Sequence, residues 1–153
     1  MTTFTYHQQH LHCESVPLAD IAAQVGTPVY VYSRAELQQR AMAYQTAVPS
    51  DRSLVCYAVK ANGNPTLLRL LRDAGLGADV TSGGELFLAL HAGIAPGKII
   101  YSGVGKTRAE IETAVRASIH ALHVESEMEL LTVESVAREL QTQAAISVRV
   151  NPD

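Results

Sequence analysis

Residues 77–102 read GADVTSGGELFLALHAGIAPGKIIYS, and this stretch decides the fold class. Ala78–Thr81 and Ile99–Ser102 have the composition of short buried strands, and Gly84–Ala92 between them has the composition of a helix. Two strands joined through a helix of this length run parallel, because an antiparallel partner needs only a hairpin. The stretch is therefore predicted to be a βαβ unit.

The same alternation continues on both sides of this unit. Further strands are predicted over Ser53–Val59, Ala121–Glu125 and Ala144–Val150, and further helices over Arg34–Ala47, Pro65–Ala74, Arg108–Ala117 and Glu127–Gln141. Four helices begin with Ser or Thr followed three residues on by Glu, the spacing of a capping box. These pairs are Ser33 with Glu36, Ser82 with Glu85, Thr107 with Glu110 and Ser126 with Glu129. The chain is thus predicted to be a series of βα units.

About five parallel strands fit two architectures. One is a small open doubly wound sheet, and the other is the first part of a (β/α)₈ barrel, which typically needs ~250 residues. The sequence ends at Val150-Asn151-Pro152-Asp153, directly after a predicted strand and with no helix to cover it. We therefore expect a barrel truncated after about five strands.

Composition excludes several classes of protein. The 153 residues carry a formal charge of −3, so no basic excess is available to neutralise the phosphates of a nucleic acid. No apolar run approaches the ~18–20 residues that span a bilayer, so a membrane protein is not expected. Cys13 and Cys56 form neither a CxxC pair nor a disulfide framework. A reducing, cytoplasmic location is the prediction.

Residues 1–32 do not follow the βα pattern, because proline and glycine interrupt them. His7, His10, His12 and Cys13 lie close together, but they lack the CxxC or HxxxH spacing of a zinc site. We expect no metal here and a poorly ordered terminus.

Three charged residues fall on predicted strands or at their ends. Lys60 follows the first strand, at the edge where barrels and open sheets place their chemistry, and an amine there can attack a carbonyl. Asp79 and Arg149 lie within strands, where a charge is costly unless it is paired or faces a site. Ordinary solvated side chains remain the alternative for all three. Glu85 could join them, although its spacing from Ser82 is explained by helix capping.

A phosphate-binding loop is a further candidate site in the sequence. Ser102–Thr107 ends in the GKT of a P-loop and lies between a strand and a helix, but Ile100 stands where the motif requires its first glycine. The loop is therefore too short to wrap a diphosphate.

Several segments together resemble a known family. They are GTPVYVY at residues 26–32, YAVKAN at 57–62, GADVTSGGEL at 77–86, VESE at 124–127 and RVNPD at 149–153. In this order they resemble the barrel-type (fold III) amino-acid decarboxylases that use pyridoxal phosphate. Within that family the combination is most similar to the diaminopimelate decarboxylases, and it spans nearly the whole chain.

The resemblance implies a fold and a site. Residues 33–153 would form the first part of a (β/α)₈ barrel of the alanine racemase-like kind, and residues 1–32 would pair with a β-rich domain beyond Asp153. Lys60 would bind the aldehyde of pyridoxal 5'-phosphate covalently, while Asp79, Glu85 and Arg149 match positions that line the cofactor side of the family's barrel. No metal is implied.

The resemblance also implies a function: decarboxylation of meso-diaminopimelate to L-lysine by a cytoplasmic homodimer acting on a small amino acid. The 153 residues would be an amino-terminal fragment that is inactive alone. Two alternatives stay open at this point, a decarboxylase of the ornithine or arginine type and a non-catalytic barrel protein that binds pyridoxal phosphate.

Overall fold

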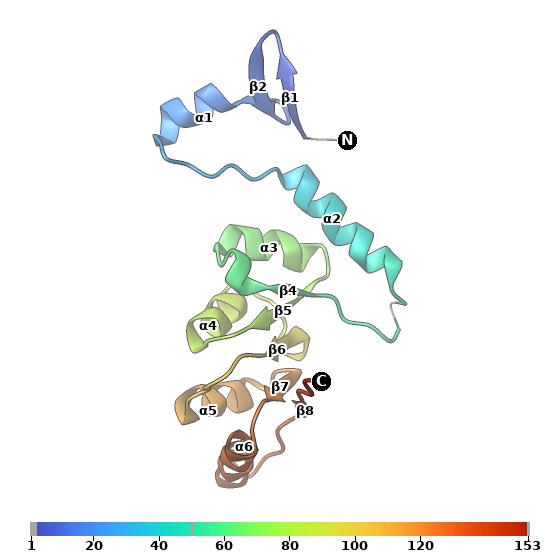
Figure 1. The fold of residues 1–153 in the computed structure, drawn as a ribbon, viewed down its shortest axis with the longest axis vertical. Helices are drawn as coiled ribbons and strands as arrows, with labels where there is room; N and C mark the ends of the chain where they lie inside the picture. Colours follow the sequence, from blue (N-terminus) through green and yellow to red (C-terminus); the bar gives the residue numbers. More distant parts are fainter. Residues whose placement is uncertain (1–2, 50, 153) are drawn as a thin grey trace. The chain divides into compact units, whose positions relative to one another are not determined.

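The computed structural model describes residues 3–49 and 51–152. They form two compact units, Met1–Val48 and Pro49–Asp153, and each is described here by itself (Figure 1). None of the described helices is both long enough and apolar enough to cross a lipid bilayer.

The amino-terminal unit contains a small antiparallel sheet. Its strands β1 (Phe4–His7), β2 (His10–Cys13) and β3 (Val16–Pro17) pair in chain order, and helices α1 (Leu18–Val25) and α2 (Arg34–Ala47) follow. The prediction of a poorly ordered terminus is therefore wrong for the described residues.

The reason for this error lies in the turn between β1 and β2. His7 pairs with His10, so Gln8 and Gln9 form a two-residue loop, with φ of 47° and 69°. Positive φ at both positions is usually supplied by Asn and Gly. Because glutamines occupy them here, the sequence carries no recognisable hairpin signal.

The second unit is a parallel sheet with a helix after most strands. Its five strands are β4 (Cys56–Ala58), β5 (Gly77–Val80), β6 (Ile99–Tyr101), β7 (Ala121–Val124) and β8 (Ile146–Val148). The helices are α3 (Pro65–Asp73), α4 (Gly83–His91), α5 (Arg108–Ala117) and α6 (Glu127–Glu139). Each predicted element of this unit is present, although several are shorter than predicted.

Strand order separates the two architectures that the sequence left open. The strands lie in the order β4-β5-β6-β7-β8, and each neighbouring pair is parallel. A doubly wound sheet reverses its strand order and carries helices on both faces, whereas a (β/α)₈ barrel adds strands sequentially with helices outside. Figure 1 shows α3–α6 along one side of the sheet. The prediction of a partial barrel is confirmed.

The core lies between the sheet and these helices. Ala78, Val80, Ile99, Tyr101 and Leu122 are at most 1% exposed, and together they form the helix-facing side of β5, β6 and β7. They pack against Leu68, Leu86, Ile111, Val133 and Val136 of the helices. Burying each large side chain contributes ~1.5–3 kcal/mol. Since side chains alternate along a strand, residues between them face the opposite side, the interior of the barrel.

All four predicted Ser and Thr caps are confirmed, because each hydroxyl accepts a hydrogen bond from the backbone N–H of the Glu three residues on. Of these four pairs, only Thr107 and Glu110 also form the reciprocal bond, in which the backbone N–H of the cap residue donates to the Glu carboxylate. Glu85 and Glu129 instead accept the N–H of the residue before the cap, Thr81 and Glu125 respectively. These two glutamates therefore tie each helix to the end of its own strand.

Two element ends differ from the prediction in a way that concerns the site. Strand β4 stops at Ala58, and a 3-10 turn over Val59–Ala61 follows, so Lys60 lies on a turn. Strand β8 stops at Val148, so Arg149 lies just beyond the strand that was predicted to contain it. β-branched composition extends past the end of regular pairing in both places, which explains the overlong predictions.

Candidate active site at the carboxyl edge of the sheet

Lys60 is held at the carboxyl edge by the turn that follows β4. Val59 before it is 1% exposed and anchors the turn in the core, whereas Lys60 itself is exposed. The following loop is braced internally: the Tyr57 hydroxyl donates to the Asn62 carbonyl oxygen at 3.3 Å, and Asn64 N–H donates to Asn62 Oδ1 at 3.0 Å. Within residues 3–49 and 51–152, no group hydrogen-bonds to the Lys60 amine. A fixed backbone thus presents an amine that has no hydrogen-bond partner in the described part of the chain.

Asp79 lies on the neighbouring strand, facing the barrel interior. It pairs in register with Ala58, two residues before Lys60, and its neighbours Ala78 and Val80 both face the helices. Its Oδ1 atom is buried and has no hydrogen-bond partner among the described residues. A buried carboxylate oxygen without a donor is costly, so this atom is suited to a ligand that brings a donor.

The environment of Cys56 supports this placement of Asp79. Burial, and then the nearby Asp79 carboxylate, raise the pKa of the Cys56 thiol to about 11. Cys56 pairs in register with Gly77, on the same face as Asp79. The Cys56 thiol and the Asp79 side chain thus lie near each other on the interior face of β4 and β5.

Glu85 is committed to the end of β5. Its Oε2 atom accepts the Thr81 N–H at 2.7 Å and the Thr81 hydroxyl at 3.1 Å, while its own N–H donates to Ser82. The capping interpretation of Glu85 is therefore right for its backbone N–H. Its carboxylate instead fixes Thr81, which directly follows Val80.

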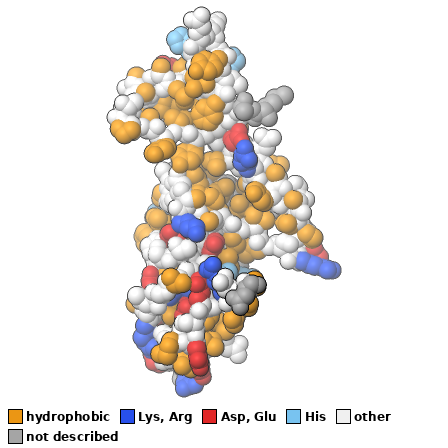
Figure 2. All heavy atoms as spheres, viewed as in Figure 1, with side chains coloured by type: hydrophobic (Ala, Val, Ile, Leu, Met, Phe, Trp, Pro, Cys, Tyr) orange, Lys and Arg blue, Asp and Glu red, His pale blue; other side chains and the backbone are white. Residues whose placement is uncertain are grey.

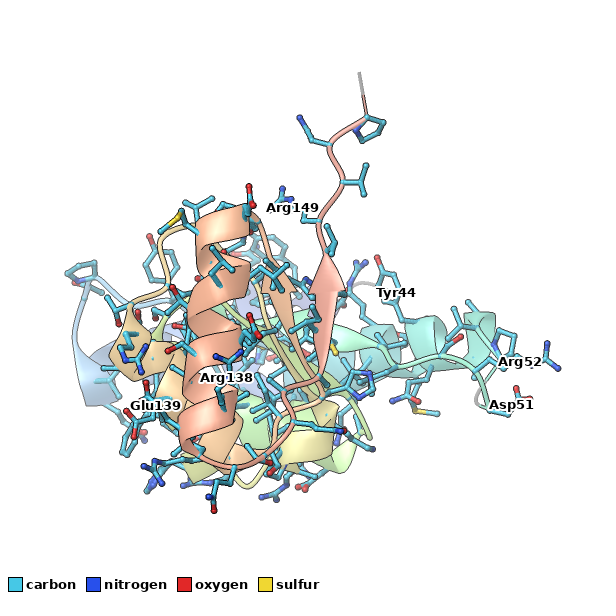
Figure 3. All side chains as sticks on the ribbon, turned by 90° about the horizontal axis from the view of Figure 1, so that it is seen from below. Tyr44, Asp51, Arg52, Arg138, Glu139 and Arg149 are labelled. Carbon is cyan, nitrogen blue, oxygen red and sulfur yellow. The ribbon has the colours of Figure 1, made fainter. Side chains whose placement is uncertain are left out.

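Arg149 is held by one carboxylate. Its Nη1 donates to Glu125 Oε1 at 3.2 Å, and the same oxygen accepts the Gly103 N–H at 3.1 Å. The Arg149 side chain is 61% exposed and that of Glu125 is 12% exposed. Figure 3 shows Arg149 beside the amino end of α6. One end of the guanidinium is thus tethered while most of it stays accessible.

The four predicted site residues therefore share one edge of the sheet but make no direct contact network. Lys60, Asp79 and Glu85 lie on or after β4 and β5, and Arg149 follows β8. Among the described residues, no hydrogen bond or ion pair joins any of the four to another.

Lys106, the lysine of the GKT segment, has a different environment. Its side chain is 1% exposed, and it donates to Gly103 O at 2.8 Å, His123 O at 2.7 Å and Glu129 Oε1 at 2.6 Å. An ammonium has three protons, and all three are used. The segment therefore holds two strand-end loops together and offers no lysine to a phosphate.

Glu110 is a further charged residue at this edge. The sequence predicted for it only a part in the capping box with Thr107. Its carboxylate accepts the N–H of Thr107 at 2.9 Å and the N–H of Gly83 at 2.7 Å, so it joins the amino ends of α5 and α4. These bonds lower the pKa of Glu110 to about 2. Burial and a hydrogen bond to Glu110 raise the pKa of Tyr101. No local sequence signal could have revealed the bond to Gly83.

A sequential parallel βα sheet with its accessible polar groups at the carboxyl edge defines a protein of the (β/α)₈-barrel class. A sequence model of the family described as "Pyridoxal-dependent decarboxylase, pyridoxal binding domain" matches residues 34–153. The chain belongs to this family, as the motifs predicted.

Individual relatives agree with this assignment. The chain is 48% identical to a diaminopimelate decarboxylase of Aquifex aeolicus over 148 residues, which covers 97% of the chain and 35% of the relative. It is also 48% identical to a diaminopimelate decarboxylase of Vibrio cholerae over 154 residues, covering 100% of the chain and 37% of the relative. The chain thus spans about a third of the length of the curated relatives it matches.

A solved structure shows the same fold. The crystal structure of diaminopimelate decarboxylase from M. jannaschii in complex with L-lysine superposes with a TM-score of 0.94 at 33% identity, covering 99% of this chain and 36% of that one.

Proposed function

We propose that this chain supplies the amino-terminal, lysine-bearing part of a pyridoxal-phosphate-dependent decarboxylase that converts meso-diaminopimelate to L-lysine. Two features carry the proposal, in a chain that belongs to the pyridoxal-dependent decarboxylases: the exposed Lys60 amine after β4, and the buried Asp79 oxygen on the neighbouring strand β5. Neither has a hydrogen-bond partner among the described residues. The substrate is supported by the names of the relatives and by the M. jannaschii enzyme that was solved with L-lysine.

The residues present fit the cofactor. Lys60 would hold its aldehyde through the amine, because this amine is exposed and forms no hydrogen bond within the described residues. The Asp79 carboxylate would accept a donor from the bound group, which satisfies the oxygen that is otherwise buried without a partner. The exposed guanidinium of Arg149 would face an anionic group.

Pyridoxal phosphate supplies, when bound, a conjugated ring that accepts the electron pair left behind as CO₂ departs. The chain's own contribution is orientation. The turn over Val59–Ala61 fixes the Lys60 backbone through the buried Val59, and Glu85 fixes the end of β5 just beyond Asp79. A rigid frame of this kind aligns the reacting bond without further reorganisation.

We propose further properties of the protein on the same basis. Residues 1–32 would pair with a β-rich domain. The antiparallel sheet β1–β3 in this stretch supports this proposal, because strands of another domain can pair with a sheet. A homodimer is inferred from the family resemblance. The two free cysteines suit a reducing cytoplasm. The 153 residues alone would be inactive, because they cover about a third of the named relatives.

The chain offers a clean test because it contains three lysines, Lys60, Lys98 and Lys106. The full-length protein is loaded with pyridoxal phosphate, reduced with borohydride and mapped by mass spectrometry, and CO₂ release is measured in parallel. We expect the pyridoxyl group on Lys60 and faster CO₂ release from meso-diaminopimelate than from ornithine or arginine. Lys60→Arg should abolish both signals, whereas the matched control Lys98→Arg should retain them.

Three results would contradict the proposal. A pyridoxyl group on Lys98 or Lys106 would remove the assignment of Lys60. Faster turnover of ornithine or arginine would move the protein to another branch of the family. A specific adduct on Lys60 without any CO₂ release would favour a binding protein without catalysis.

A further inference from the structure

Lys106 connects two loops at the carboxyl edge. Its acceptors are Gly103 O in the loop after β6, His123 O at the end of β7 and the Glu129 carboxylate in the first turn of α6. The ion pair is buried, with side chains 1% and 7% exposed. Because the three protons of the ammonium are all engaged, its role lies in holding these groups together.

Glu129 passes this constraint to the end of β7. Its Oε1 accepts from Lys106 at 2.6 Å, and its Oε2 accepts the Glu125 N–H at 3.1 Å. Ser126 caps the same helix by accepting the Glu129 N–H at 3.2 Å. The backbone of Glu125 is thereby fixed from the helix side.

Glu125 is fixed from the other loop as well. Its Oε1 accepts the N–H of Gly103, the same residue whose carbonyl oxygen binds Lys106. Gly103 is itself confined, because its φ is 97° and a Cβ there would lie 3.2 Å from the Thr81 carbonyl oxygen. Lys106, Glu129, Glu125 and Gly103 thus form a closed ring of contacts.

Arg149 is the one residue of this group with an accessible cationic end. Its side chain is 61% exposed, and an exposed ion pair of this kind has little stability of its own. The position of the guanidinium therefore depends on how rigidly its acceptor is held. That acceptor, Glu125 Oε1, is the atom that the buried ring fixes.

We infer that Lys106 and Glu129 are positioning residues that set the location of the Arg149 guanidinium through Glu125. This inference rests on the proposed function, in which Arg149 faces the cofactor. It also gives the GKT segment, which lacks the remainder of a P-loop, a role at this edge: its lysine holds the groups that position Arg149.

The test compares affinity with stability in the full-length protein. The dissociation constant of pyridoxal phosphate is measured from the Lys60 adduct, and the melting temperature and the amide exchange of the cofactor-free protein are measured separately. We expect Lys106→Met to raise the dissociation constant about tenfold, the loss seen when outer-shell support of a bound metal is removed. Arg149→Met should raise it similarly, and the two changes combined should raise it no further. Lys98→Met is the matched control and should leave it unchanged.

A second variant distinguishes a positioning role of Lys106 from a purely structural one. Lys106→Met combined with Glu129→Leu removes both buried charges, so the melting temperature should largely recover, because no unpaired charge remains. Affinity should stay about tenfold weaker, and amide exchange at Glu125 should stay faster than in the unmodified protein. Should Lys106→Met fail to fold, Glu129→Gln, which keeps the side-chain shape, is compared with Arg149→Met in the same way.

Recovery of affinity together with stability would overturn the inference, and so would a combined Lys106→Met and Arg149→Met effect of about a hundredfold. Failure of the unmodified protein to form any adduct on Lys60 would instead contradict the proposed function.

Discussion

The Glu110 carboxylate should stabilise the fold in a way that depends on pH. It joins the amino ends of α4 and α5 by accepting the N–H of Gly83 at 2.7 Å, the N–H of Thr107 at 2.9 Å and the Thr107 hydroxyl at 2.8 Å. The perturbation is Glu110→Gln, which keeps the size of the side chain. One of the two acceptor oxygens is replaced by an amide nitrogen, which cannot accept these bonds.

The magnitude follows from the pKa. The native contacts lower the pKa of Glu110 from 4.5 to about 2, and at ~1.36 kcal/mol for each tenfold change in protonation this corresponds to ~3 kcal/mol. Because the carboxylate is partly accessible to water, screening reduces the expected value to ~1–2 kcal/mol. The native pKa is the lower one, so this stability is complete above pH 4.5 and is lost as the pH falls from 4.5 towards 2.

The assay is urea unfolding of the full-length protein at a series of pH values between 3 and 7. Glu110→Gln should lower the free energy of unfolding by ~1–2 kcal/mol at pH 7, and more than half of that difference should disappear by pH 3. The control is Glu112→Gln on the same helix, whose exposed pair with Arg116 should contribute less than ~0.5 kcal/mol. A difference that is the same at pH 7 and pH 3, or a Gln variant as stable as the unmodified protein, would refute this reasoning.

Two further predictions concern the interior face of β4 and β5. Gly77→Ala should destabilise by about 3 kcal/mol in thermal unfolding, because its Cβ would lie 2.2 Å from the Lys98 carbonyl oxygen, whereas Gly97→Ala, with nothing within 4 Å, should change little. A stable Gly77→Ala protein would show that the strands can separate there. Cys56, with its pKa raised to about 11, should react with iodoacetamide at pH 8 roughly a hundredfold more slowly than an exposed thiol. Asp79→Asn should speed that reaction by lowering the pKa, and an unchanged rate would mean that Asp79 lies too far away to act.

The βα repeat was predictable because its signals are local. A hydroxyl cap such as Ser82 marks a helix start within four residues, and a glycine such as Gly93, with a φ of 82°, marks a helix end. The order of the strands in the sheet was not predictable from these signals, because it depends on contacts between segments that are distant in the sequence. The hairpin around Gln8 and Gln9 was missed since its turn uses residues that rarely adopt positive φ.

The candidate site was predictable only in part, and Lys106 shows why. Lys60 could be found because a strand, a basic residue and a glycine-containing loop follow one another directly in the sequence. The acceptors of Lys106 are 3, 17 and 23 residues away, on three different segments, and no spacing rule connects them. Its motif suggested a phosphate loop, whereas its partners show a buried ion pair.

A common arrangement underlies these contacts. Four helices have a glutamate as their third residue, and in three of them its carboxylate accepts a backbone N–H at the carboxyl edge: Glu85 from Thr81, Glu110 from Gly83 and Glu129 from Glu125. A carboxylate near a helix amino terminus is favoured by the helix dipole, so the residue type suits its position. Two of these bonds tie the end of a strand to the helix that follows it, and the third ties the amino ends of α4 and α5 together. The Glu125 backbone is held in this way and the Glu125 side chain contacts Arg149, which is why we expect changes in buried residues such as Lys106 to alter cofactor affinity at a distance.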